Sequence, residues 1–530
     1  MDEWEAAIAG WQQSPLRGDG STGSHSATPW HSMRVPLAAI VFRRWLGRIE
    51  ASPLGYRLAQ GAFWSVVGTG TSRALQFAAF ILVARLLGKA RFGELGMVQS
   101  TIIMFGTFAG FGLGLTATKF MAEYRATDPT RAGRIRGLSS ATALVTSLTA
   151  ALVLLVSAPY LAQRILASPH LEPALRIGAL LLFFTVLTGA QGGVLVGLEA
   201  FRSLAHVSFW TGALSFPLLA CGAYFGSLDG VLWALVIATA LNWLMNQLAI
   251  RHECARMNVP FTYRGSWAER AVLWKFSVPS VFAGAIAVPV IWLANAMLVN
   301  QPNGYAEMGA YNAVMRVKQL PEMFLQMIMA PILPVLSEQR SRKSLRDYER
   351  TLFYTLKFSI LLMVPLSLLQ MAVPSLTLLP YGLDYQGNGY VVQWLMLHGA
   401  VFGIFWPMSH IVATANRMWL ASLYNTLWAG VFLLMSYVLI PSYMAIGLSA
   451  SYTLAYLITG IPFMLYVRYR ETELIAGLPM LSTLTTTLLA ALVFGVLGII
   501  APKPIAFPVA LGLLILTVLI WVMRGRLFKV

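Results

Sequence analysis

The chain has 530 residues, of which 57% are hydrophobic and only 11% are charged, and its mean hydropathy is +0.67. This small number of charged side chains cannot cover the surface of a water-soluble protein of this size. The composition therefore excludes a soluble globular enzyme and indicates a polytopic membrane protein. The two cysteines, Cys221 and Cys254, offer no disulfide or metal framework.

Apolar runs of about 20 residues, the length that crosses a bilayer as a helix, recur along the chain. We predict fourteen spans, near residues 61–86, 94–116, 137–159, 174–196, 205–226, 229–250, 275–299, 310–336, 352–379, 389–414, 418–440, 443–467, 481–500 and 505–523. No alternation typical of strands occurs, so the expected fold class is an all-α polytopic membrane protein.

The spans and loops predict five parts. They are a partly disordered cytoplasmic tail (1–57), an N-terminal six-helix lobe (58–252), a cytoplasmic linker (253–272), a C-terminal six-helix lobe (273–470) and two additional transmembrane helices (471–530).

The net charge of +17 could suggest a nucleic-acid partner, but the positions of the cations indicate a topology instead. With a cytoplasmic N-terminus, 29 of the 38 Lys and Arg residues lie in inner segments, 6 in outer loops and 3 inside spans. This asymmetry follows the positive-inside rule and places both termini in the cytoplasm of a multi-pass protein of the cell (inner) membrane. We therefore expect contact with anionic membrane lipids and no nucleic-acid binding.

The charged residues that we assign to the interior of predicted spans are Arg73 in the first span and Arg316, Lys318 and Glu322 in the eighth. A charge in hydrocarbon costs at least about 2.5–3.5 kcal/mol on insertion scales, so it usually faces a cavity on the path of a substrate or ion. Arg73 lies too deep to reach either membrane surface easily. For Arg316 and Lys318, a position in the outer headgroup zone is the open alternative.

The spacing of Lys318 and Glu322, four residues apart, would let them neutralise each other on one helix face. Glu322 could instead be a protonatable coupling group. Gln319 and Gln326 are candidates for hydrogen bonds to a polar substrate, although such residues often join helices. His398 and His410 are interpreted as packed histidines and do not predict a metal site.

An internal repeat is visible in the sequence. Phe92–Gly96 (FGELG) is echoed by Tyr305–Gly309 (YAEMG) at an offset of 213, and Gly197–Gly212 is echoed more weakly by Ala415–Gly430 at an offset of 218. Six spans separate the copies, so the lobes are expected to be parallel repeats with a cavity between them. Arg73 and Arg316 would then come from opposite lobes.

Four motifs carry a resemblance to a known family: LLGKARFGELG (86–96), GLEAFR (197–202), KFSVPS (275–280) and MGAYNAVMRV (308–317). In this order and spacing, the chain from Leu58 to Arg470 resembles the polysaccharide biosynthesis family of the multidrug/oligosaccharidyl-lipid/polysaccharide exporter superfamily. The resemblance implies two six-helix lobes that move a lipid-linked oligosaccharide across the membrane by alternating access, and two further helices as in members with fourteen. Where relatives often carry an acidic residue late in the seventh span, this chain has Asn295, which puts cation coupling through that position in question.

The predicted function is a flippase that exports a polyprenyl-diphosphate-linked oligosaccharide for exopolysaccharide or O-antigen biosynthesis. Arg73, Arg316 and Lys318 are the candidate ligands of the anionic head group, because Arg binds phosphate bidentately and stays charged. No cofactor is expected, and coupling to H⁺ or Na⁺ is left open. A polysaccharide polymerase or export machinery is a candidate partner.

Two alternatives are weighed against this function. Export of lipid II or of drugs would use the same architecture, but cationic drugs would favour an acidic cavity. A membrane glycosyltransferase or polymerase would need catalytic acids in a sizeable outer loop, whereas the outer loops here are short.

Overall fold

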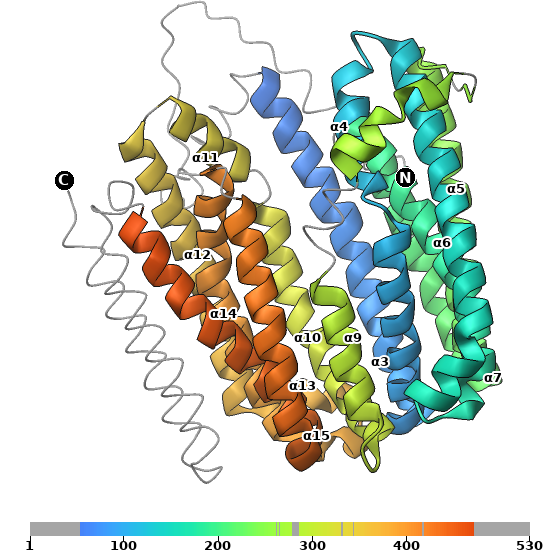
Figure 1. Cartoon of the computed structure of the whole chain (residues 1–530), viewed down its shortest axis with the longest axis vertical. Coiled ribbons are helices and arrows are strands. Elements are labelled where there is room, and N and C mark those ends of the chain that lie inside the picture. Colours follow the sequence, from blue (N-terminus) through green and yellow to red (C-terminus); the bar gives the residue numbers. More distant parts are fainter. Residues whose placement is uncertain are drawn as a thin grey trace, which may run out of the picture. The chain divides into compact units, whose positions relative to one another are not determined.

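The computed structural model describes residues 53–260, 262–263, 265–277, 286–329, 332–342, 344–415 and 418–470 (Figure 1). The chain divides into two compact units, Met1–Ala59 and Gln60–Val530. Most of the predicted tail and the two predicted C-terminal spans lie outside the described residues.

The described part is helical and contains no β-strand, which confirms the all-α fold class. Its α-helices are α3 (Pro53–Ala109), α4 (Leu113–Tyr124), α5 (Pro129–Tyr160), α6 (Glu172–Gly197), α7 (Phe201–Arg256), α9 (Ala287–Val299), α10 (Gly304–Met329), α11 (Ile332–Ser341), α12 (Leu345–Ala372), α13 (Pro374–Leu378), α14 (Gly389–Thr414) and α15 (Met418–Arg470). Short π or 3₁₀ turns, η1 to η6, lie at Leu161–Ile165, Pro169–Leu171, Ser266–Glu269, Leu273–Ser277, Leu379–Tyr381 and Leu383–Asn388.

Six of the described helices are long and apolar enough to cross a membrane, or up to eight if each of two bent pairs is one span. Three helical runs far exceed one crossing: α3, α7 and α15 have 57, 56 and 53 residues, or roughly 80 Å each if straight. Each is interrupted by one residue with non-helical backbone angles, at Gly88, Ser227 and Met444. Gly88 and Ser227 lie between predicted spans, and Met444 is the second residue of the predicted span 443–467. Each run therefore has room for two spans. The count of fourteen stays a prediction.

The interruptions in α7 and α15 have the same geometry. Ser227 has φ 54° and ψ −136°, and Met444 has φ 50° and ψ −125°. The two residues are 217 positions apart, close to the offsets of the sequence repeat. A glycine follows three residues after each interruption, Gly230 in α7 and Gly447 in α15. A Cβ at Gly230 would overlap the carbonyl oxygen of Gly222, and a Cβ at Gly447 would overlap that of Leu439. Two separate parts of the chain therefore make the same tight turn.

The two halves of the chain are in close contact where α3 and α10 cross at the repeated motifs. A Cβ at Gly93 would overlap the carbonyl oxygen of Tyr305, and a Cβ at Gly309 would overlap that of Lys89. Gly96 likewise abuts the side chain of Asn312. The glycines of both motifs thus allow the two backbones to touch.

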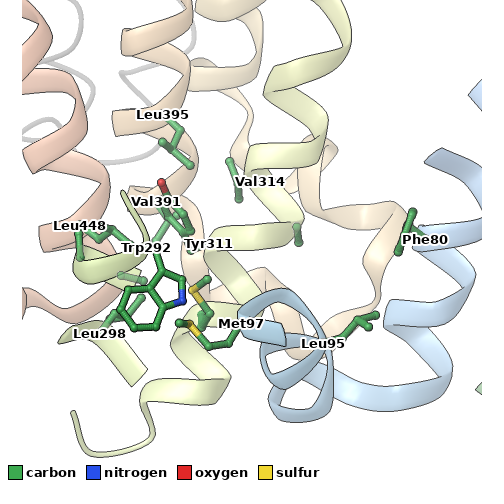
Figure 2. Packing of buried hydrophobic residues seen from close by; sticks show 14 of the residues in the cluster. Phe80, Leu95, Met97, Trp292, Leu298, Tyr311, Val314, Val391, Leu395 and Leu448 are labelled. Atoms are coloured by element: carbon green, nitrogen blue, oxygen red, sulfur yellow. The ribbon is translucent and has the colours of Figure 1, made fainter. Parts of the chain in front are cut away.

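Buried apolar packing continues this contact into α9. The indole nitrogen of Trp292 donates a hydrogen bond to Thr101 Oγ1 at 2.9 Å, and Figure 2 shows Trp292 beside Met97 in a cluster that also includes Leu298 and Leu448. Residues of α3, α9, α14 and α15 therefore share one apolar core.

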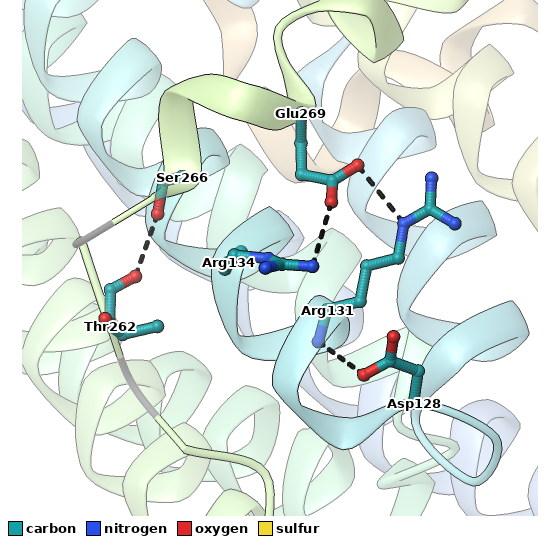
Figure 3. A network of polar contacts seen from close by, with 6 residues as sticks. All are labelled: Asp128, Arg131, Arg134, Thr262, Ser266 and Glu269. Atoms are coloured by element: carbon teal, nitrogen blue, oxygen red, sulfur yellow. Dashed lines mark hydrogen bonds and ion pairs between the residues drawn. The ribbon is translucent and has the colours of Figure 1, made fainter.

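The segment predicted as the linker packs against the start of α5 (Figure 3). Asp128 caps α5 by accepting a hydrogen bond from the backbone nitrogen of Arg131 at 2.9 Å. Glu269 forms ion pairs with Arg131 at 3.2 Å and with Arg134 at 3.4 Å. The described part of the linker is thus fixed to the first half of the chain.

The crossing of α3 and α10 yields a stability prediction. Gly93→Ala places a methyl group against backbone, so we expect it to lower the free energy of unfolding by about 1–3 kcal/mol, as overpacking does. Gly192→Ala in α6 is the matched control, because a Cβ there meets nothing within 4 Å. Thermal unfolding of the purified variants measures the difference, and equal melting temperatures would contradict the close crossing.

Candidate functional site

A cavity lies between α3 and α10. It has two parts, of about 310 and 520 Å³, which share Arg73, Gln76, Phe80, Arg316 and Gln319. The smaller part is lined in addition by Phe77, Leu320, Glu322, Met323 and Gln326. The larger part reaches α6, α7 and α9 and has a polar lining that includes Gln99, Ser100, Thr185, Thr211, Ser215, Thr239, Asn242, Asn295, Tyr311 and Asn312.

Arg73 lines both parts of the cavity, and its side chain is exposed. Its guanidinium has no ion-pair or hydrogen-bond partner among the described residues. A buried apolar face would not tolerate such a charge, so the cation depends on water or on a ligand in the cavity.

Arg316 lies on the opposite wall and contacts α3. It donates a hydrogen bond to Gln99 Oε1 at 2.6 Å, and its guanidinium lies 3.6 Å from the ring centre of Phe80 and 5.8 Å from that of Phe92. Neither contact supplies a negative charge, although the aromatic faces partly stabilise the cation. Arg316 therefore both joins the two helices and presents positive charge to the cavity.

Lys318 does not line the cavity, in contrast to the role assigned to it from the sequence. It is 2% exposed and lies behind the wall, with its ammonium 2.9 Å from Glu322 Oε1 and 5.2 Å from the ring centre of Tyr452. Its position on α10, about 200° around from Arg316, directs it toward α15. The expected pairing of Lys318 with Glu322 is present, and it removes Lys318 from the candidate head-group ligands.

Glu322 lies between the cavity and the protein interior. It is 8% exposed and lines the smaller part, while its Oε1 also lies 3.7 Å from His398 Nδ1 of α14. Gln319 and Gln326 line the same part and are exposed, which leaves them able to bind a polar ligand.

Asn295 lines the larger part and is 5% exposed. Its side-chain nitrogen donates a hydrogen bond to Ser100 Oγ at 3.0 Å, and its Oδ1 has no hydrogen-bond partner among the described residues. The amide thus links α9 to α3 instead of providing an acid.

Several cavity residues were not singled out from the sequence. Gln76 lies one helical turn after Arg73, and Gln99 is the acceptor for Arg316. The sequence did contain a signal for these residues, because polar residues at helical spacing from a charge within a span are expected to share its face of the helix. The contact of His398 with Glu322 had no such signal, because 76 positions separate the two residues.

The balance of charge in the cavity is positive. Glu322 is the one carboxylate among its described lining residues, and Lys318 pairs with it, whereas the charges of Arg73 and Arg316 have no acidic partner there. No group of three His, Cys, Asp or Glu side chains in the described ranges could hold a metal ion. The cavity is suited to an anion with a polar body.

A family model described as polysaccharide biosynthesis protein matches residues 58–340, more than half of the chain. The chain belongs to this family. Its curated relatives include the lipid III flippase of Escherichia coli (strain K12), 27% identical over 57% of this chain and 71% of the relative. Another is the EPS I polysaccharide export inner membrane protein EpsE of Ralstonia nicotianae, 28% identical over 47% of this chain and 57% of the relative.

Two solved structures show the same fold. An inward-facing multidrug resistance MATE family transporter of the MOP superfamily superimposes with a TM-score of 0.63, at 13% identity over 78% of this chain and 99% of that one. The lipid II flippase MurJ in an inward closed conformation also gives 0.63, at 14% identity over 87% and 99%. The family match, the relatives and the two structures together place the chain among the flippases and exporters of the MOP superfamily. The chain is a multi-pass inner-membrane protein.

The buried ion pair yields a prediction about stability. Glu322→Ala leaves Lys318 as an uncompensated buried charge, so we expect a loss of about 3–5 kcal/mol in the free energy of unfolding. The double variant Lys318→Met with Glu322→Gln removes both charges and is expected to recover most of this loss. Thermal unfolding measures both.

The control is the surface pair of Glu172 and Arg176, whose side chains are 25% and 54% exposed. Glu172→Ala is expected to cost less than about 1 kcal/mol. A double variant at 318 and 322 as unstable as Glu322→Ala alone would show that the pair is not the reason for the loss.

Proposed function

We propose that this protein is a flippase that moves a polyprenyl-diphosphate-linked oligosaccharide across the inner membrane for the synthesis of a cell-surface polysaccharide, exopolysaccharide or O-antigen. The observation that carries the proposal is the pair of arginines without acidic partners, Arg73 from the first half of the chain and Arg316 from the second. Their planar guanidinium groups can each bind phosphate oxygens bidentately while remaining charged.

The rest of the cavity suits the remaining parts of such a substrate. Gln76, Gln319 and Gln326 offer hydrogen bonds to sugar hydroxyls beside the arginines. The serine, threonine and asparagine side chains of the larger part offer further hydrogen bonds to sugar hydroxyls. A lipid tail would remain outside, in the bilayer next to the cavity.

The geometry also supports a direction of access. The positive-inside rule puts the turn around Gly88 on the outer side, and there the two halves are in contact through the α3–α10 crossing and a 3.8 Å ion pair of Lys89 with Glu307. We infer that the described conformation is closed to the outside. The repeated motifs and the matching turns at Ser227 and Met444 support two parallel six-helix lobes that rock about this contact.

Other cargoes remain as alternatives with different demands on the site. Lipid II has the same diphosphate chemistry, and this chain has the same fold as the lipid II flippase MurJ, so lipid II is an alternative cargo. A cationic drug fits poorly, because it would meet two arginines. A polymerase or other export machinery as partner, and H⁺ or Na⁺ as coupling ion, are further parts of the proposal.

The head-group site is tested by complementation of a flippase-null strain. We expect Arg73→Ala, expressed at the wild-type level, to reduce surface glycan at least about tenfold, because a lost charge-assisted contact to a phosphate costs more than about 1.4 kcal/mol. Arg316→Ala is expected to do the same. Arg164→Ala is the control, since this exposed arginine of η1 lies outside the cavity. Full surface glycan from both cavity variants would rule out the proposed site.

A further inference from the structure

A buried ionisable cluster lies directly behind the wall that α10 forms for the cavity. Glu322 connects it to the cavity, and behind Glu322 lie the ammonium of Lys318 at 2.9 Å and the imidazole of His398 at 3.7 Å, both measured to the same oxygen. Lys318 of α10 and His398 of α14 thus share the carboxylate of Glu322. Neither of them belongs to the residues that would contact a head group.

His398 is the unusual member of this cluster. It is 2% exposed, and neither of its ring nitrogens has a hydrogen-bond partner among the described residues. The rings of Tyr452 and Tyr456 hold it in place, with ring centres at 4.6 and 4.7 Å. A buried polar group without partners is costly, and such a group in a native structure usually has a functional reason. A small side-chain rotation would bring Nδ1 within hydrogen-bond distance of Glu322.

We propose that Glu322 and His398 form a proton-binding site coupled to occupancy of the cavity. The coupling rests on the proposed function, since the ligand that drives it is the anionic head group. In the unprotonated state, Lys318 and Glu322 balance each other and His398 is neutral. One proton taken from water then binds His398 Nδ1 and is shared with Glu322 Oε1; the net charge of the cluster rises by one, and no other bond changes.

A proton fits this site better than a metal cation does. The ammonium of Lys318 already occupies a cation position against the carboxylate, 2.9 Å from Oε1. A sodium ion would need several oxygen ligands, whereas the second group here is an imidazole that binds a proton directly. Asn295, which stands where relatives often carry an acidic residue, lies on α9 and is not part of this cluster.

The charges around the cluster explain why the proton would be coupled to the substrate. The ionisable groups facing it are Lys318 and Tyr311 from α10, Tyr424, Tyr452 and Tyr456 from α15, and, across the cavity, Arg73 and Arg316. None of these is an acid that is ionised near neutral pH, and no second carboxylate lines the described cavity. An added proton is therefore repelled until an anion enters, and by linkage the proton must strengthen binding of the anion equally.

The test measures binding of a short-chain polyprenyl diphosphate to the purified full-length protein in lipid nanodiscs at several values between about pH 5.5 and pH 8.5, the range in which histidine titrates. We expect wild-type affinity to rise about tenfold toward the acidic end, a typical coupling. The diphosphate itself loses negative charge in that direction, so its own titration would weaken binding. Tighter binding therefore identifies proton uptake by the protein.

His398→Gln is expected to bind the probe at the alkaline end as the wild type does but to lose the increase at acidic pH. His410→Gln is the matched control. It lies on the same helix, 12 residues on, and its ring packs on Trp406 with centres 4.8 Å apart, away from Glu322. The control is expected to keep the full pH response. If it lost the response as His398→Gln does, the assignment to His398 would be overturned.

A second measurement does not depend on the ligand. Infrared difference spectra of the protein between acidic and alkaline pH are expected to contain imidazolium and carboxyl bands that are absent from His398→Gln and from the double variant Lys318→Met with Glu322→Gln. Wild-type spectra identical to those of both variants would overturn the proton site. The double variant removes the ion pair as a unit, so it serves if a single substitution prevents folding.

The two proposals fail in different ways. If Arg73→Ala weakened binding but wild-type binding did not depend on pH, the proton coupling would be overturned. The proposed flippase function would not be affected. No binding at any pH would overturn the head-group site, and the infrared spectra would then decide on the proton site alone.

Discussion

The arrangement of the site depends on how closely α3 and α10 approach each other. Backbone contact at Gly93 and Gly309 sets the separation of the two helices at one end, and the cavity opens between them further along. Arg73 and Arg316 face this space from opposite helices. Larger residues at the crossing would separate the helices and change the distance between the two cations, so a packing constraint among glycines determines the electrostatics of the site.

The charges within the membrane fall into two groups with different environments. Arg73 and Arg316 have no acidic partner among the described residues and lie on the cavity wall, where water or an anion can stabilise them. Lys318 and Glu322 are buried and compensate each other. A charge in hydrocarbon is stabilised either by a wet cavity or by an opposite charge. Within two turns of α10, Arg316 is stabilised in the first way and Lys318 and Glu322 in the second.

Membership of the polysaccharide biosynthesis family, together with the relatives named as a lipid III flippase and as a polysaccharide export protein, gives the class of transport. The likeness to MATE and MurJ structures gives the fold. Neither identifies the cargo. The cavity combines positive charge with polar side chains. This combination disfavours cationic drugs but does not distinguish one lipid-linked glycan from another.

The sequence by itself determined the membrane class, the all-helical fold and the family, because apolar length and the order of motifs are local properties of the chain. It also anticipated the pairing of Lys318 with Glu322, which depends only on helical spacing. Tertiary structure alone decided that Lys318 lies behind the wall, that Arg316 stacks on Phe80 and that His398 meets Glu322. Those contacts join residues far apart in the chain, and which face of a helix meets a neighbour follows from packing that no spacing in one sequence records.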